Sequence, residues 1–231
     1  MRLFPLLACV WMGCATAGNG SNNDNPDGNP GTDSTPLIDA GVDARPIDAL
    51  VMATLSQTTD TTVVAGGSVA CGTSTYTAEN SFYRIFELTS MGVTGPFTVT
   101  GVSFGVEAST GTQSVQVKIG TYAGAAGGTL STAMITPLSS ATVVVPALPT
   151  AQMLSTPITG TVPAGGKLIV EIFSPDHSVG VAAKFYIGAS AGTESAVAYL
   201  RAPTCSTPEP RPIKQLDPAV GSLIITATGT H

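Results

Sequence analysis

The sequence predicts an all-β domain of two packed antiparallel sheets, preceded by an N-terminal segment that has no core. Only 10% of the 231 residues are charged, and Gly, Pro, Thr, Val, Ser and Ala are abundant. Short alternating apolar segments are separated by Gly, Pro and Ser at hairpin intervals, without helical segments to link parallel strands. We expect one sandwich domain over residues 54–231, with a jelly-roll-like topology favoured over an immunoglobulin-like one.

Residues 1–13 have the pattern of an export signal. Arg2 precedes a short apolar stretch that is too short to span a bilayer as a mature helix. The string Trp11-Met12-Gly13-Cys14 resembles a bacterial lipobox, in which the cysteine is diacylated and becomes the new N-terminus, although Trp11 stands where an aliphatic residue is usual. We expect Cys14 to anchor the protein to the cell envelope, on the outer membrane if the source is Gram-negative.

A second processing route remains open at the same place. Ala15-Thr16-Ala17 is a small-x-small site, and cleavage after Ala17 would discard Cys14 and release a free secreted protein. Leu6-Leu7-Ala8-Cys9 fits the lipobox better in its letters but leaves too short an apolar core for export.

Residues 14–53 are expected to form a disordered linker, because they are rich in Asn, Asp, Gly, Pro, Ser and Thr and offer almost nothing to bury. Most of the net charge of −6 lies here, where only Arg45 opposes a group of acids: Asp24, Asp27, Asp33, Asp39, Asp43 and Asp48. The remaining Lys and Arg residues are scattered singly and form no basic stripe, so we do not expect the protein to bind nucleic acid. The Gly and Glu positions of an EF-hand loop are missing from the Asp-rich segment.

Alternation of apolar and polar residues predicts the strands of the domain. Residues 114–120 and 167–173 each place three apolar side chains on one face, as a half-buried strand does. In residues 97–107 the apolar set changes phase across Gly101, which predicts a β-bulge at this glycine. Further strands are expected over these ranges: 81–88, 141–146, 183–188 and 222–228.

Cys71 and Cys205 are the only cysteines outside the export segment, and they lie near the two ends of the domain. We expect them to form a disulfide, since an exported chain folds in an oxidising compartment. Closing so long a loop restricts the unfolded chain by roughly 4 to 5 kcal/mol on the chain-entropy estimate. Two distant cysteines and two histidines do not make a zinc site.

Four stretches taken together look like a β-sandwich module that is often appended to secreted and surface bacterial proteins. They are "SFYRIFEL", "GVTGPFTVTGVSFGVE", "VPAGGKLIVEIF" and "AYLRAPTC". The resemblance covers most of residues 65–230 and implies a fold and an extracellular placement. It carries no activity and no catalytic residues, and its cysteines correspond to Cys71 and Cys205.

One string resembles a hydrolase motif. Residues 188–192, "GASAG", fit G-x-S-x-G, and Asp217 and His231 follow Ser190 in the order used by α/β-hydrolases. That motif needs a parallel sheet built from strand and helix units, which this pattern lacks, and His231 is the last residue. We therefore expect a Gly-rich turn here, with a serine hydrolase as the rival hypothesis.

Two other strings have simpler interpretations. Residues 160–168, "GTVPAGGKL", have Gly and Lys in a loosely P-loop order, but the spacing differs and Leu168 replaces the Ser or Thr that binds magnesium. We expect a turn. "SPDH", residues 174–177, is expected to be a solvated turn, because catalytic relays bring together residues from separate elements.

Two binding hypotheses depend on tyrosines and acids. The only Trp lies in the export signal, so the stacking of sugar rings would depend on tyrosines. We expect Tyr76 and Tyr122 to lie near turns and to be exposed. Tyr83 and Tyr186 are expected in strands, where they pack in the core. Structural calcium would need four isolated acids to converge. They are Glu79, Glu107, Glu171 and Asp176. We expect no other cofactor, and the favoured function is a noncatalytic binding or adhesion module for an extracellular protein or glycan.

Overall fold

The structure is a computed structural model that describes residues 50–180 and 182–231, and these residues belong to one compact unit. The predictions for the export signal, Cys14 and most of the linker lie outside the described residues. The first strand begins at Met52, two residues before the predicted start of the domain.

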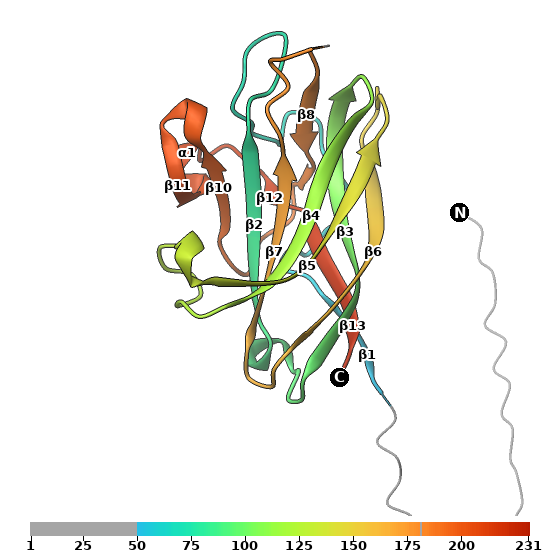
Figure 1. The fold of residues 1–231 in the computed structure, drawn as a ribbon, viewed down its shortest axis with the longest axis vertical. Coiled ribbons are helices and arrows are strands. Elements are labelled where there is room, and N and C mark those ends of the chain that lie inside the picture. Colours follow the sequence, from blue (N-terminus) through green and yellow to red (C-terminus); the bar gives the residue numbers. More distant parts are fainter. Residues whose placement is uncertain (1–49, 181) are drawn as a thin grey trace, which may run out of the picture. The chain divides into compact units, whose positions relative to one another are not determined.

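The described residues form an all-β fold with short helical turns (Figure 1). The strands are β1 (Met52–Leu55), β2 (Asn80–Glu87), β3 (Phe97–Thr110), β4 (Gln113–Tyr122), β5 (Ile135–Val145), β6 (Gln152–Val162), β7 (Lys167–Ser174), β8 (Lys184–Ile187), β9 (Ala189–Ser190), β10 (Ala198–Ala202), β11 (Thr207–Pro212), β12 (Ser222–Leu223) and β13 (Ile225–Thr230). The helical turns are η1 (Thr89–Met91), η2 (Thr132–Met134), η3 (Pro203–Cys205) and α1 (Ile213–Leu216).

Two large antiparallel sheets form the sandwich that the sequence predicts. One sheet has the order β1-β13-β3-β6, with β8 added along the far end of β3, and the other has the order β11-β10-β2-β7-β4-β5. β9 and β12 form a small third pair. From β2 to β13 the chain changes sheet at most connections, and only the pairs β4–β5 and β10–β11 of the two large sheets remain in one sheet as consecutive strands. This repeated crossing agrees with a jelly-roll-like topology.

The predicted bulge lies at Gly101. Val99 pairs with Gly229 and Gly101 with Thr228, so Thr100 is the extra residue of β3 at this point. Above and below the bulge the buried residues of β3 change phase, as the sequence indicates. One inserted residue therefore lets a long strand keep an apolar face toward the core along its whole length.

The main core lies between the two large sheets. Its fully buried aromatic residues are Phe82, Phe86, Phe97, Phe104 and Phe185. They come from β2, β3 and β8, so strands distant in the sequence share one apolar interior. Each such ring contributes roughly 2 kcal/mol or more through its burial.

A second apolar cluster lies on the outer face of the six-stranded sheet. Its buried members are Tyr83, Ile85, Tyr122, Leu130, Ile169 and Tyr199. The segment between β4 and β5 packs on this face, where the Tyr199 hydroxyl donates to the Gly128 carbonyl over 2.8 Å. Both faces of β2 are therefore buried, and its residues from Asn80 to Phe86 are buried without alternation.

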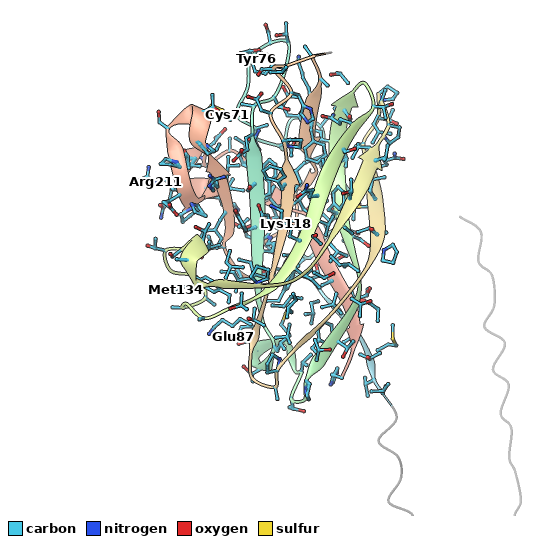
Figure 2. The ribbon with its side chains drawn as sticks, in the orientation of Figure 1. Cys71, Tyr76, Glu87, Lys118, Met134 and Arg211 are labelled. Carbon is cyan, nitrogen blue, oxygen red and sulfur yellow. A yellow bond between two sulfur atoms is a disulfide. The ribbon has the colours of Figure 1, made fainter. Side chains whose placement is uncertain are left out.

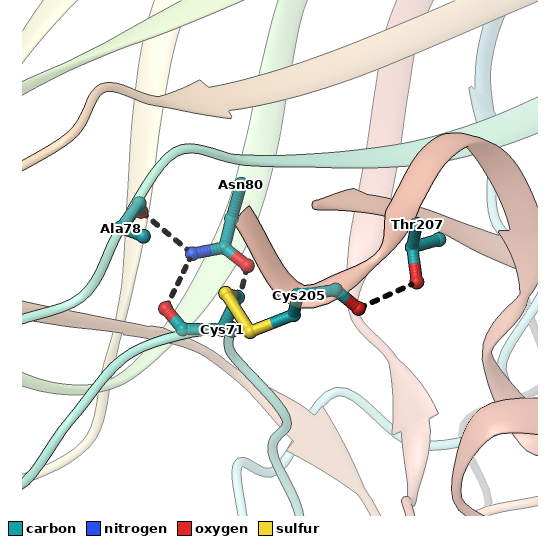
Figure 3. Close-up of a disulfide and its surroundings, with 5 residues drawn as sticks. All are labelled: Cys71, Ala78, Asn80, Cys205 and Thr207. Atoms are coloured by element: carbon teal, nitrogen blue, oxygen red, sulfur yellow. Dashed lines mark hydrogen bonds between the residues drawn. A yellow bond between two sulfur atoms is a disulfide. The ribbon is translucent and has the colours of Figure 1, made fainter. Parts of the chain in front are cut away.

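The predicted disulfide joins Cys71 and Cys205, whose Cα atoms are 5.8 Å apart (Figure 3). It connects the loop before β2 to the η3 turn after β10. The Asn80 side chain fixes the first of these segments, because its Oδ1 accepts from the Cys71 amide over 2.8 Å and its Nδ2 donates to the Cys71 and Ala78 carbonyls. The bond thus ties the two ends of the domain across 134 residues of sequence.

Candidate functional site

An open groove of about 720 Å³ lies at the side of the sandwich where β1 is the edge strand. Its apolar lining includes Leu55 and Met91, which belong to the main core, and Ile85 and Val197, which belong to the outer cluster. The groove is therefore the place where the two apolar clusters open to solvent. We define these lining residues and their neighbours in residues 53–57, 85–91, 126–127 and 195–197 as the edge groove.

One wall of the edge groove is the free edge of β1. Val51 and His231 exchange both backbone hydrogen bonds, at 3.0 and 3.1 Å, as a hydrogen-bonded pair of the β1–β13 ladder. Antiparallel ladders alternate, so the N–H and C=O groups of Met52 and Thr54 point away from β13. These backbone groups face the open side of the strand.

The opposite wall contains the end of β2. Pairing of β10 with β2 stops at Arg84, which leaves the last three residues of β2 without a strand on that side. The Gln57 amide nitrogen donates to the Ile85 carbonyl, so the backbone groups of Ile85 and, by alternation, of Glu87 face the groove. Two open strand edges from different sheets thus line one cavity.

Gln57 is the most unusual polar residue of the edge groove. Its side chain is buried, with 5% of the residue exposed, and lines the cavity. Its Nε2 is satisfied by Ile85, but its Oε1 has no hydrogen-bond partner within the part of the chain that the structure describes. A buried acceptor without a donor costs free energy, which marks Gln57 as a strained polar position in the groove lining.

A buried arginine holds the wall behind Gln57. Arg84 is fully buried; its guanidinium donates to the carbonyls of Ala196 over 2.6 Å and Leu223 over 2.8 Å, and it forms an ion pair with Glu194 at 3.1 Å. Burial lowers the pKa of Arg84, and the neighbouring Glu194 opposes that shift. Lys214 forms a second ion pair with Glu194 at 3.4 Å. The network fixes the segment that precedes β10.

Glu87, which Figure 2 labels near the end of β2, is an acid that lines the edge groove. Its Oε2 accepts from the Ser90 hydroxyl over 3.0 Å, and no ion pair neutralises it among the described residues. Lys167 is its register partner on β7 but makes no ion pair with it. A smaller hollow of about 190 Å³ adjoins the groove and shares Ser56, Gln57 and Ser195 with it.

The structure does not bring the hydrolase-like residues together. Ser190 is fully buried in β9, where its hydroxyl lies 2.9 Å from that of Thr58. Asp217 is exposed and caps the amide of Ala219. His231 pairs with Val51 beyond the far end of β13, whereas Ser190 pairs with Ser222 at the start of β12. Roughly 25 Å of extended chain separates Ser222 from His231.

The "SPDH" string is a turn with more internal order than the sequence indicates. Ser174 is fully buried, and its hydroxyl lies 3.3 Å from His177 Nε2. Asp176 instead accepts from the Ser178 amide, which lowers the pKa of its carboxyl. Burial lowers the pKa of His177, against the effect of Asp176. The prediction of a wholly solvated turn is therefore wrong for Ser174, whose buried hydroxyl meets the imidazole at the end of β7.

The P-loop-like string forms the turn that joins β6 to β7, as predicted. Gly166 donates to the Pro163 carbonyl over 2.9 Å, and Gly165 has a positive φ of 69°. The lysine that follows, Lys167, begins a strand.

The tyrosines only partly follow the expectation. Tyr122 is buried, at 3% exposure, and its hydroxyl donates to the Thr129 carbonyl, so the prediction that it is exposed is wrong. Tyr76 and Tyr186 are half-buried. Tyr83 is buried in the outer cluster, not in the main core. The segment after β4 covers Tyr122, and sequence alternation does not reveal such coverage.

The four isolated acids have separate partners instead of a common site. Glu79 pairs with Arg201 and Glu171 with Lys118, while Glu107 accepts from the amides of the segment before Cys71. Asp176 caps its own turn. Among residues 50–180 and 182–231, no three His, Cys, Asp or Glu side chains are grouped as metal ligands.

No helix within the described residues is both long and apolar enough to cross a membrane. Comparison of the chain with protein-family models, with curated proteins and with solved structures finds no match. The resemblance to the secreted bacterial module stays a prediction.

Proposed function

We propose that this protein is an extracytoplasmic lipoprotein, anchored through Cys14, that displays a noncatalytic binding or adhesion module. The edge groove carries the binding role, because it combines an open cavity, apolar walls and a buried acceptor without a donor. The partner is an extracellular protein or a glycan.

Two other features support this proposal. A disulfide suits an exported protein, because oxidising compartments preserve such bonds. The burial of Ser190 against Thr58 favours a structural serine over a nucleophile, which an incoming substrate has to reach.

Cell fractionation tests the anchor. We expect Cys14→Ser to move the protein from the membrane fraction to the soluble extracytoplasmic fraction, because it removes the thiol that the lipid needs. Cys9→Ser is the matched control and leaves the protein in the membrane fraction. A wild-type protein found only in the soluble fraction would favour the secreted alternative.

Activity and binding assays test the module. We expect the purified domain to show no esterase or peptidase turnover that depends on Ser190, as tested with Ser190→Ala. We also expect saturable binding to a ligand on a protein and glycan array. Gln57→Leu weakens this binding, because Leu lacks both polar atoms of the Gln57 side chain. Turnover abolished by Ser190→Ala would assign the protein to the hydrolases instead.

A further inference from the structure

The shape of the edge groove indicates what kind of partner it takes. One wall is the free edge of β1, with the backbone groups of Met52 and Thr54, and the other is the end of β2, where Gln57 already holds the Ile85 carbonyl and the backbone groups of Glu87 face the groove. Such alternating donors and acceptors complement another polypeptide backbone in extended form. A sugar ring or a lipid chain does not present this regular alternation.

We propose that the edge groove binds an extended polypeptide segment, which adds as a strand to the free edge of β1. The inference rests on the proposed binding function and names its ligand class. The apolar lining, with Leu55, Ile85, Met91 and Val197, receives alternate side chains of the added strand, since one face of a strand carries every second residue.

The charge of the groove defines the segment further. Glu87 is a carboxylate without an ion pair among the described residues, whereas Glu194, in the adjoining hollow, is already paired with Arg84 and Lys214. The segment therefore carries a Lys or Arg where it passes Glu87.

Charge also disfavours an occupant from the chain itself. Residues 24–48 carry six Asp residues and one Arg, so this stretch would bring negative charge to a groove whose unpaired side chain is also negative. A foreign, basic, extended segment satisfies both the backbone groups and the carboxylate.

A fluorescent synthetic peptide tests the proposal against the mature full-length chain. The probe is acetyl-Thr-Val-Lys-Val-Thr-Val-Lys-Val-Thr-amide, the lysine peptide. Its partner, the glutamate peptide, has Glu in place of both Lys residues. We expect saturable binding of the lysine peptide below about 1 mM in anisotropy titrations and at least about tenfold weaker binding of the glutamate peptide.

Backbone and charge changes separate strand addition from general apolar binding. N-methylation of alternate residues, in one of its two registers, abolishes binding because it removes the donors that face β1. Thr54→Pro does the same from the protein side, since it removes an N–H of the free edge and no bond to β13, while Thr54→Val retains that N–H and binds normally.

Glu87→Lys reverses the preference and binds the glutamate peptide better, whereas Glu209→Lys, at an exposed acid on β11, changes nothing. This charge swap keeps the proposal testable if Thr54→Pro fails to fold. Failure of both peptides to bind, or binding that is indifferent to N-methylation and to Glu87→Lys, overturns the inference. If the peptides fail to bind but Cys14 is lipidated and the array shows a ligand, the proposed binding function stands, and only the assignment of an extended polypeptide as the ligand is wrong. Two further results would also overturn the inference. In the first, the lysine peptide binds only when a second copy of the chain is present. In the second, removal of residues 18–49 increases binding, which shows that the chain itself already occupies the groove.

Discussion

Among the described residues, Arg84 is the one Lys, Arg, Asp or Glu that is buried. Its guanidinium is fully buried and connects β2 to two other segments, with Glu194 and Ala196 in the segment before β10 and Leu223 in β12. Charged groups are kept inside a protein only when their hydrogen bonds and countercharge are present. The sequence shows only an arginine inside an apolar strand, and alternation alone does not reveal which carbonyls it meets.

Replacement of Arg84 tests this role. We expect Arg84→Met to lower the free energy of unfolding by about 3 kcal/mol, because it leaves two carbonyls without their donor and Glu194 with Lys214 as its remaining ion-pair partner. Urea unfolding followed by fluorescence or circular dichroism measures the change. The double variant Arg84→Met with Glu194→Gln is expected to recover part of the loss. An unchanged midpoint in the single variant would contradict the assignment.

His177 gives the fold a pH dependence. Burial lowers its pKa from 6.5, against the opposing effect of Asp176, so the unfolded chain binds the proton more readily than the folded one. Stability therefore falls as the pH drops through 6.5 and levels off below the lowered pKa of the folded state. We expect the drop in Tm between about pH 7.5 and 5.5 to be smaller in His177→Asn than in the wild type. His231→Asn serves as the control, and an equal drop in all three proteins would refute the effect.

At the level of elements, the disulfide joins the loop before β2 to the turn after β10. Its closed loop spans 134 residues of sequence. We expect Cys71→Ser with Cys205→Ser to lower the free energy of unfolding by about 4 to 5 kcal/mol on the chain-entropy estimate, and urea unfolding checks this value. Dithiothreitol should destabilise the wild type to the same extent and leave the double variant unchanged. A double variant as stable as the wild type would show that the crosslink contributes nothing.

The bulge of β3 also depends on a close approach of its neighbour β13. A methyl group at Gly229 would lie 2.6 Å from the Phe97 ring and would also meet the Thr98 carbonyl oxygen. We expect Gly229→Ala to cost about 2 kcal/mol, through displacement of β13 from the bulged part of β3. Gly95→Ala is the control, since nothing lies within 4 Å of its added methyl group. Thermal unfolding distinguishes them, and equal Tm values for both variants would contradict the packing argument.

For the whole molecule, the sequence predicts what depends on local alternation. The expected strands correspond to β2, β3, β4, β5, β7, β8, and β12 with β13, and the bulge at Gly101 is confirmed. The strand β6 was missed because its Ser, Thr and Pro residues leave only a weak apolar face. No strand is predicted at β1, whose first two residues fall in the predicted linker, because its four residues are too few for a periodic signal.

The edge groove could not be predicted from the sequence for a different reason. Thr54 and Gln57 lie in one segment and Glu87 and Val197 in two others, and only the meeting of two sheet edges brings the three segments to one groove. Gln57 gives no signal in the sequence, because its importance comes from burial and from the missing donor for Oε1. The hydrolase-like string shows the opposite case, in which the letters suggest a site and the fold separates Ser190 from His231.

The intact mass of the mature protein, purified from the membrane fraction, tests the central claim of an anchored binding module most directly. We expect a chain that begins at Cys14 and carries a diacylglyceryl group on that cysteine. A mature chain that begins at Gly18 without any lipid would contradict the anchor.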